Sequence, residues 1–304
     1  MTGRVPLVPT RCAICGTEGE ADEVYPANVN VDTLDDVVFS ARRPPDGIHF
    51  RMVRCRRCRL LRSDPIIPAE HLARLYAGSH FDEGEVPNLR RTYGRVLAEL
   101  DRHGARRDAL LEIGSGTGFF LEEARTHGYR RTVGVEPSQA AAAEADRRPG
   151  VETIRDVMRP GVFEAGAFDV VCIFQTLDHL PDPAGVLDEC RRVLLPGGLV
   201  VAFNHDTSAL PARVLGDRSP IVDVEHTYLY DPATMRRLFE SRGYEVLAVG
   251  PVRNLVSLRY LLHLLPLPPG LKAVARAVLA PVGGARLWMP LGNVRLIARR
   301  PAGG

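Results

Sequence analysis

Short apolar runs alternate with helix-like stretches from Ala109 to the end of the chain. The runs cover residues 110–113, 132–135, 170–174, 199–203, 246–249 and 294–298. Between them, apolar residues recur at three- and four-residue spacing over 119–127, 138–146, 183–193 and 232–242. Apolar strands without polar alternation, separated by helices, are typical of a largely parallel sheet covered on both faces. The pattern therefore predicts a doubly wound α/β fold.

The first 108 residues follow a different pattern. Residues 1–68 hold two cysteine pairs and several proline and glycine breakers, whereas 69–108 show helical apolar spacing. We therefore predict three parts: a four-cysteine module over 1–68, a helical connection or lid over 69–108, and the α/β domain over 109–304. Within the last part, an apolar, proline-rich insertion occupies about 252–290.

Composition sets limits on partners and compartment. The 304 residues carry a formal net charge of +2, which is too small to indicate nucleic acid or an anionic membrane as the partner. Residues 1–10 lack a charged region followed by an apolar one, and no uncharged apolar run reaches the length of a membrane span. The sequence therefore predicts a cytoplasmic protein with no membrane span.

Four of the six cysteines form two Cys-x-x-Cys pairs, Cys12 with Cys15 and Cys55 with Cys58. In a reducing compartment, two such pairs favour a closed tetrahedral Zn²⁺ site over disulfides. A thioredoxin-like redox pair is the alternative, and it is disfavoured because neither pair opens a helix after a strand. We predict structural zinc without a catalytic part.

A glycine-rich loop follows the first apolar run of the α/β part. Gly114, Gly116 and Gly118 stand where a strand turns into a helix, a position at which such sheets bind ligands. The next run ends at Glu136, an acidic residue placed to accept the hydroxyl protons of a ribose. A dinucleotide fingerprint would need a glycine at 119, which is Phe119. The loop thus indicates a nucleoside cofactor without a pyrophosphate.

Three segments resemble motifs of the class I S-adenosylmethionine (SAM)-dependent methyltransferases. Residues 110–120, with Glu112 before the glycines, resemble motif I; residues 169–183 resemble "FDvv…vlEHlpDp"; residues 187–198 resemble "L.E..RvLkPGG". The resemblance implies a Rossmann-like seven-stranded sheet with helices on both faces and SAM as the cofactor. The residues that it implies for SAM binding are Glu112, Gly114, Ser115, Gly116, Gly118, Phe119, Glu136, Pro137, Asp156 and Gln175.

The lead-in after the second cysteine pair narrows the resemblance to a subgroup. Residues 60–65, followed by Leu72, Leu75, Tyr76 and Phe81, resemble bacterial methyltransferases of sugar and natural-product pathways that carry an N-terminal CxxC…CxxC zinc module. Here Arg59 replaces the usual glycine. Six arginines crowd this region: Arg51, Arg54, Arg56, Arg57, Arg59 and Arg62. We interpret them as a solvated face; a site for an anionic substrate or RNA is the alternative.

Two histidines are candidates for removing a proton from the acceptor, because a histidine near neutral pKa is the usual base. His226 lies in Glu225-His226-Thr227-Tyr228, which resembles the subgroup's "EH..y" segment. By this resemblance His226 is the general base, Glu225 orients it and Tyr228 assists. His179 lies after the apolar run 170–174 and serves either in catalysis or in shaping the cofactor pocket.

The resemblance implies methyl transfer from SAM to a hydroxyl or amine of a small molecule, such as a sugar- or nucleotide-linked or natural-product intermediate. Carbon is less favoured, because the related carbon methyltransferases carry an additional C-terminal domain. An RNA methyltransferase that docks through its zinc module and a non-catalytic binding protein are the alternatives. Residues 252–290 are expected to pack across the sheet with one face lining the acceptor site, and contact with a membrane surface is the alternative. The oligomeric state is left open.

Overall fold

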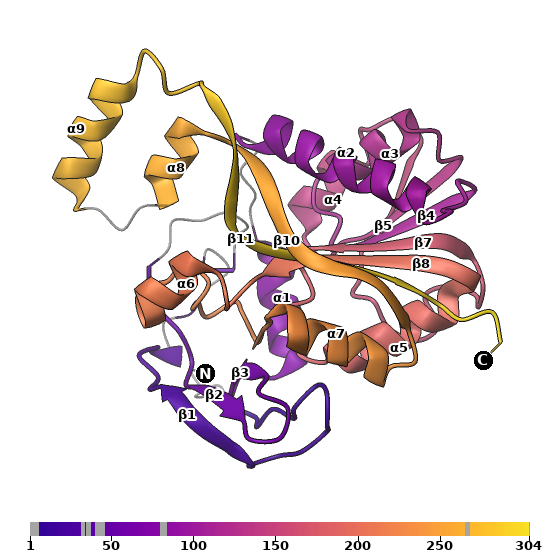
Figure 1. Cartoon of the computed structure of the whole chain (residues 1–304), viewed down its shortest axis with the longest axis horizontal. Coiled ribbons are helices and arrows are strands. Elements are labelled where there is room, and N and C mark those ends of the chain that lie inside the picture. Colours follow the sequence, from indigo (N-terminus) through magenta and orange to yellow (C-terminus); the bar gives the residue numbers. More distant parts are fainter. Residues whose placement is uncertain are drawn as a thin grey trace.

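The computed structural model describes residues 6–31, 34, 38–39, 46–79, 84–264 and 268–303 (Figure 1). Phe81, part of the predicted lead-in, lies outside these residues. Within the described ranges, no helix is both long enough and apolar enough to cross a membrane.

A seven-stranded mixed sheet forms the centre of the molecule, as the sequence predicts. Its spatial order is β10-β11-β8-β7-β4-β5-β6, with β11 antiparallel to both of its neighbours and the other pairs parallel. The strands are β4 (Ala109–Ile113), β5 (Arg131–Val135), β6 (Val151–Ile154), β7 (Phe168–Phe174), β8 (Leu194–His205), β10 (Glu245–Ser257) and β11 (Arg286–Arg299).

The central strands are apolar throughout because both of their faces are buried. Leu110 packs with α2 (Val86–Arg102) and α3 (Phe119–Thr126) on one face, and Leu111 packs with α5 (Pro183–Val193) and α7 (Pro232–Ser241) on the other. Val170 and Val171 alternate in the same way along β7. Each such fully buried side chain contributes about 1.5–3 kcal/mol of burial free energy. Figure 1 shows these helix pairs on opposite sides of the sheet.

Two further helices border the carboxyl ends of the strands. The helix α4 (Gln139–Ala145) begins at Ser138, whose hydroxyl accepts a hydrogen bond from the backbone of Ala141. The helix α1 (Ala69–Gly78) packs against α4. α1 and α4 therefore place residues from 69–78 and 138–145 beside the glycine loop.

A four-stranded antiparallel sheet follows the first cysteine pair and includes Cys55 of the second. Its order is β1 (Ala21–Tyr25), β2 (Met52–Cys55), β3 (Leu61–Ser63) and β9 (Tyr228–Leu229). The last strand comes from the α/β part, so the two parts share a sheet. All four cysteine side chains also pack into the hydrophobic cluster that holds α5 and α7.

The hairpin of β10 and β11 extends well beyond the runs 246–249 and 294–298 that the sequence predicts. Its strands pair from Glu245 with Arg299 to Ser257 with Arg286. At its far end lie α8 (Leu258–Leu264) and α9 (Pro269–Leu279), which project from the sheet in Figure 1. The residues of 252–290 thus do not pack across the sheet as we expected, because most of them form this projection. The short helices α6 (Leu210–Leu215) and η2 (Gly216–Arg218) precede β9.

Candidate functional site

The turn from β4 into α3 consists of three glycines with a left-handed backbone. Gly114, Gly116 and Gly118 have φ angles of 70°, 52° and 71°. A Cβ atom on Gly114 would lie 2.3 Å from Thr176 Oγ1, whereas one on Gly116 would meet no atom within 4 Å. Gly114 therefore allows the turn to pack against the residues after β7, and Gly116 leaves room for a ligand to approach the backbone.

Glu136 is buried at the end of β5 and holds this turn in place. Its Oε2 accepts a hydrogen bond from Gly116 N at 2.7 Å, and its Oε1 accepts one from Ser138 N at 2.8 Å. Burial raises the pKa of Glu136, while the two backbone hydrogen bonds act in the opposite direction. Because a carboxylate offers about four lone-pair directions, each oxygen can still accept a hydroxyl proton from a ligand.

Three buried polar atoms near the turn have no hydrogen-bond partner among the described residues: Glu112 Oε2, Ser115 Oγ and Gln175 Oε1. Such an atom costs about 1–3 kcal/mol when it is left unsatisfied. Gln175 also has a φ of 51°, in the left-handed region that non-glycine residues rarely adopt. Burial, and then the charge of Glu136, raise the pKa of Glu112. The unpartnered atoms identify a place where a polar ligand would be accommodated.

The remaining predicted cofactor residues lie around the same edge. Phe119 is buried and stacks on Tyr93 at 5.9 Å between ring centroids, and Pro137 is half-buried. Asp156 follows β6, where its Oδ2 accepts a hydrogen bond from Arg159 at 2.7 Å. This hydrogen bond lowers the pKa of Asp156.

A second cluster, the histidine cluster, lies beyond β7 and β8 and consists of Asp178, His179, His205 and His226. Asp178 is buried at its centre: its Oδ2 accepts a hydrogen bond from His205 Nδ1 at 2.9 Å and lies 4.0 Å from His226 Nε2. Its Oδ1 lies 3.7 Å from His179 Nε2. The ring of His226 is 4.8 Å from those of His179 and His205 between centroids.

The surroundings of His226 fix which of its nitrogens carries the proton. Its Nδ1 lies 2.8 Å from the carbonyl oxygen of Ile221, which can only accept a hydrogen bond. In the neutral ring Nδ1 is therefore protonated, and the lone pair is on Nε2, which lies 4.0 Å from Asp178 Oδ2. Burial lowers the pKa of His226, partly offset by the nearby charge of Asp178. His226 is thus a neutral base at neutral pH.

The pKa values of His179 and Asp178 are shifted by burial and by contacts within the histidine cluster. Burial lowers the pKa of His179 to about 3. Burial raises the pKa of Asp178, but His179 and the hydrogen bond from His205 outweigh it, so the pKa lies below its usual range. Asp178 is therefore an anion that faces three imidazole rings.

Tyr228 does not face His226 in the way that the sequence suggests. The backbone of Glu225 donates a hydrogen bond to Asp223 Oδ1 at 3.1 Å, and its side chain is half-buried. The phenol of Tyr228 donates to the carbonyl of Arg11 at 2.7 Å, on the side of the cysteines. The carboxylate that faces His226 is that of Asp178, which sequence reasoning did not single out.

His205 and Tyr76 were also given no role from the sequence. The Tyr76 hydroxyl lies 3.0 Å from His179 Nδ1. For Asp178 and His205 the only signal is position, because they follow or end strands at the carboxyl edge, where ligands of such sheets bind. Near Tyr76, the carbonyl of Ser79 accepts a hydrogen bond from the Ser138 hydroxyl at 2.9 Å. The end of α1 therefore contacts both the glycine loop's surroundings and the histidine cluster.

The four cysteine sulfurs of the N-terminal segment lie within 4.8 Å of one another, and none forms a disulfide. The Sγ atoms of Cys15 and Cys55 are 3.7 Å apart. Tetrahedral Zn²⁺ with bonds of about 2.3 Å requires sulfurs about 3.8 Å apart. Burial raises the pKa of Cys12 to about 11, a cost that a bound divalent cation removes by stabilising the thiolate. The donor set and spacing therefore fit structural zinc.

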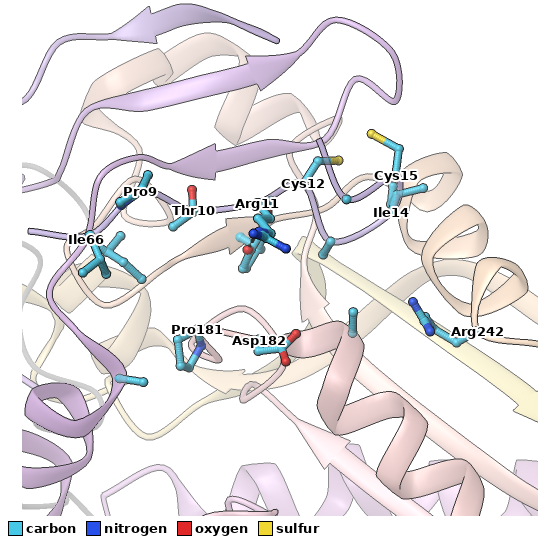
Figure 2. Close-up of a pocket in the computed structure, with 16 residues that line it drawn as sticks. Pro9, Thr10, Arg11, Cys12, Ile14, Cys15, Ile66, Pro181, Asp182 and Arg242 are labelled. Atoms are coloured by element: carbon cyan, nitrogen blue, oxygen red, sulfur yellow. Dashed lines mark hydrogen bonds between the residues drawn. The ribbon is translucent and has the colours of Figure 1, made fainter. Parts of the chain in front are cut away.

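A cavity of about 710 Å³ lies beside the cysteines, between the N-terminal segment and α5 (Figure 2). Thr10 and Arg11 line one side, and Pro181, Asp182 and Arg242 line the other. It includes neither the glycine loop nor the histidine cluster, and its guanidinium groups are paired: Arg11 with Glu18, and Arg242 with Asp188. We therefore place the chemistry at the carboxyl edge of the sheet rather than in this cavity.

The arginines near the second cysteine pair do not form one solvated face. Arg62 is buried and its Nε donates to Thr10 Oγ1 at 3.0 Å, whereas Arg56 and Arg57 are exposed. Arg51 and Arg56 pair with Asp64 and Asp22 respectively. The arginines that lie close together in sequence therefore differ in the structure: Arg62 is buried, Arg51 and Arg56 form ion pairs, and a few side chains are exposed.

Arg59 has a φ of 63°, a backbone conformation that the glycine of the subgroup's motif would adopt without strain. We expect Arg59→Gly to raise the free energy of unfolding by about 1 kcal/mol, because left-handed backbone costs a non-glycine residue about 1–2 kcal/mol. Chemical denaturation of the zinc-loaded protein measures the change. Arg57→Gly is the matched control: Arg57 is exposed without a positive φ, so glycine there should destabilise, and equal effects would contradict the explanation.

Comparison with known proteins assigns the chain to a family. The model of the family described as "Methyltransferase domain" matches residues 87–249, more than half of the chain. The ubiquinone biosynthesis O-methyltransferase of Psychrobacter cryohalolentis is 32% identical over 125 residues, covering 38% of this chain and 48% of that protein. A probable S-adenosylmethionine-dependent methyltransferase of Mycolicibacterium smegmatis is 30% identical over 155 residues, covering 50% and 57%. The chain thus spans about half the length of the curated relatives it matches.

Solved structures share the fold at low sequence identity. A putative methyltransferase from Bacillus halodurans aligns with a TM-score of 0.50 and 16% identity, over 67% of this chain and 98% of that one. A chain in the complex of the Haloferax volcanii Trm112 methyltransferase activator with a putative methyltransferase aligns with a TM-score of 0.54 and 17% identity, over 76% and 95%.

Proposed function

We propose that this chain, which belongs to the methyltransferase-domain family and is a class I SAM-dependent methyltransferase, transfers the methyl group to a hydroxyl of a small molecule. The observation that carries this proposal is His226, a buried neutral base whose lone pair is held beside a carboxylate at the ligand-binding edge of the sheet. A hydroxyl needs such a base, because its proton must leave as its oxygen attacks. The names of the curated relatives, which are O-methyltransferases, support the same choice of atom.

SAM supplies an electrophilic methyl group, so the residues around it mainly have to bind and align the reactants. Glu136 would accept the ribose hydroxyls while holding the turn through Gly116 N. The unpartnered oxygens of Glu112, Ser115 and Gln175 would satisfy polar groups of the cofactor. Gly114, Gly118, Phe119, Pro137 and Asp156 would complete the pocket. Alignment of this kind contributes up to about 7–11 kcal/mol to catalysis.

The acceptor's hydroxyl proton passes to Nε2 of His226. The resulting imidazolium still donates a hydrogen bond from Nδ1 to the carbonyl of Ile221. Its positive charge is stabilised by the carboxylate of Asp178, whose Oδ2 lies 4.0 Å from Nε2. In this proposal the carbonyl of Ile221 orients the ring, and Asp178 rather than Glu225 is the carboxylate that stabilises the imidazolium. His179, held by Tyr76, and His205 border the path of the acceptor, since their side chains are 20% and 26% exposed.

We further propose that Cys12, Cys15, Cys55 and Cys58 hold one structural Zn²⁺. Their sulfur spacing supports this assignment, and zinc would tie the N-terminal segment to the core that it shares with the sheet. As acceptor we propose a sugar or natural-product intermediate, on the resemblance of the lead-in residues 60–76 to methyltransferases of those pathways.

We expect His226→Asn to lower kcat by about 10²–10³-fold without changing the affinity for SAM, since general-base catalysis contributes about 10²–10⁴-fold. Transfer of labelled methyl from SAM to fractionated small-molecule extract, with and without nuclease, identifies the acceptor class and gives the assay. Mass spectrometry then locates the methyl on oxygen. Unreduced turnover in His226→Asn would exclude His226 as the base, and a nuclease-sensitive product would indicate RNA instead.

Dependence on pH tests the role of Asp178. The base is active when neutral and its pKa is lowered, so activity should be flat above pH 6.5 and fall on the acid side with a midpoint below that value. Asp178→Asn removes a charge that raises the pKa of His226, so the plateau should drop and the acid limb should shift to lower pH. Glu225→Gln is the matched control. A loss in Glu225→Gln but not in Asp178→Asn would reverse the assignment.

Metal content distinguishes a base from a metal ligand, because Asp178, His179 and His226 also lie within 4.8 Å of one another. We expect one zinc per chain, bound by the cysteines. A second equivalent that is lost in His226→Asn would overturn the general-base proposal.

A further inference from the structure

Charge is divided unevenly along the chain. Residues 246–304 contain eight arginines and lysines and no aspartate or glutamate, whereas residues 1–245 contain 31 basic and 37 acidic residues. The small net charge of +2 therefore conceals a cationic C-terminal segment on an anionic body. This segment begins in β10, directly after Glu245, and includes α8, α9 and β11.

The helix α9 presents apolar side chains to solvent. Leu271, Val274 and Val278 are 54%, 60% and 71% exposed. Their spacing of three and four residues places them on one face of the helix. Val282, just beyond the helix, is 50% exposed. We call these four residues the apolar stripe.

The apolar stripe lies at the far end of a projection. α9 packs mainly on α8, and both sit at the tip of the β10–β11 hairpin, away from the central sheet (Figure 1). Exposed basic side chains, among them Arg259, Arg276 and Arg286, come from the same helices and the start of β11. Trp288, which follows on β11, stacks against the guanidinium of Arg95 at 3.4 Å from the ring centroid. Apolar, basic and amphipathic aromatic groups thus gather on one projection.

From this arrangement we propose that α9 binds the surface of an anionic lipid bilayer. The helix would lie in the plane of the interface, with the apolar stripe between the headgroups and the acyl chains and the arginines on the lipid phosphates. An apolar face flanked by exposed arginines is the pattern that this mode of binding requires. The inference does not depend on the proposed methyl transfer, because it uses none of the residues assigned to that reaction.

Two other occupants fit less well. RNA would pair with the arginines but would gain nothing from exposed leucine and valine, since single-stranded RNA is held by stacking on aromatic or arginine planes. A second copy of the chain would cover the apolar stripe but would bring two cationic segments together without an acidic counterpart.

The test is co-sedimentation of the full zinc-loaded chain with vesicles of phosphatidylcholine alone or with about 30 mol% phosphatidylglycerol, at about 0.1 M salt. We expect binding to the anionic vesicles at least tenfold stronger than to the neutral ones, and weaker binding at higher salt. Val274→Asp with Val278→Asp should reduce it by a further tenfold or more, and Arg276→Glu should reduce it by severalfold.

Ile154→Asp is the matched control, since this residue is exposed on β6 at the opposite edge of the sheet and should leave vesicle binding unchanged. Calorimetric binding of S-adenosylhomocysteine, together with circular dichroism, verifies that each variant is folded. Equal loss in the control, or no binding of the wild-type chain to anionic vesicles, would overturn the proposal. Gel-shift binding of RNA that displaces the vesicles, or a dimer dissolved by the α9 variant, would overturn it too.

Discussion

Glu136→Ala should weaken S-adenosylhomocysteine binding by about a hundredfold or more in a calorimetric titration. The substitution removes two kinds of interaction together: the predicted hydrogen bonds to the ribose, and the observed hydrogen bonds that fix Gly116 N and Ser138 N. Hydrogen bonds to a charged group contribute about 1.5–3 kcal/mol each, so two suffice for a hundredfold loss. The effect should appear in affinity rather than in turnover at saturating SAM.

A control on the neighbouring strand separates this effect from general loss of charge. Glu152 lies on β6 beside β5, where it pairs with Arg131 on the surface. Glu152→Ala should leave the affinity unchanged. If Glu136→Ala bound the ligand as tightly as the wild type, the glycine loop would not be the cofactor site.

Removal of zinc should unfold or inactivate the protein, not merely loosen its N-terminus. Structural zinc contributes on the order of 10 kcal/mol in zinc-finger peptides, which matches the whole stability of a typical domain. The cysteine segment also supports the base: Ser63 Oγ donates to the carbonyl of His226 at 2.9 Å, and Ser63 N donates to the carbonyl of Thr227 at 2.8 Å. We therefore expect Cys58→Ser to lower both the melting temperature and kcat.

The measurement is zinc content, thermal unfolding and turnover on the same samples. Cys190→Ala is a suitable control, because this cysteine is buried outside the cluster and should keep one zinc with a loss of only about 1 kcal/mol. Full stability of Cys58→Ser after chelation would show that the four cysteines do not hold a structural metal.

The sheet was predictable because its signal is local. Central strands that are buried on both faces are continuous apolar runs, and the six predicted apolar runs gave six strands of the sheet in the right order along the chain. The family match confirms the predicted methyltransferase domain, and the solved structures confirm the predicted fold. The zinc-module subgroup, the domain boundaries and the individual site residues stay predictions.

The length of the hairpin was not predictable, because only one strand of its extra part is buried: Leu255 and Val256 are buried, whereas their partners Trp288 and Leu287 are half-buried and exposed. Beyond Val252 and Asn293 the strands pair only with each other, and Pro290 and Gly292 in this stretch read as breakers. The strand β9 is only two residues long and pairs with β3 across more than 160 residues of sequence. Such pairing depends on the tertiary fold, so no local sequence pattern predicts it.

The glycine loop and the histidine cluster differ in the same way in how far the sequence predicts them. The glycine loop and Glu136 lie on consecutive strands, so motif and register brought them together. The histidine cluster combines the residues after β7, the end of β8 and the segment before β9. The resemblance assigned Glu225 as the partner of His226, whereas the fold places Asp178, from a distant segment, 4.0 Å from His226 Nε2.

The end of α1 has a thermodynamic consequence. A chain of hydrogen bonds runs from Glu136 through Ser138 to Ser79, and Tyr76 of the same helix reaches His179. If binding of one ligand orders α1, the second ligand no longer has to supply the free energy of that ordering and therefore binds more tightly. Linkage makes such coupling reciprocal: the factor by which the cofactor tightens the acceptor is the factor by which the acceptor tightens the cofactor.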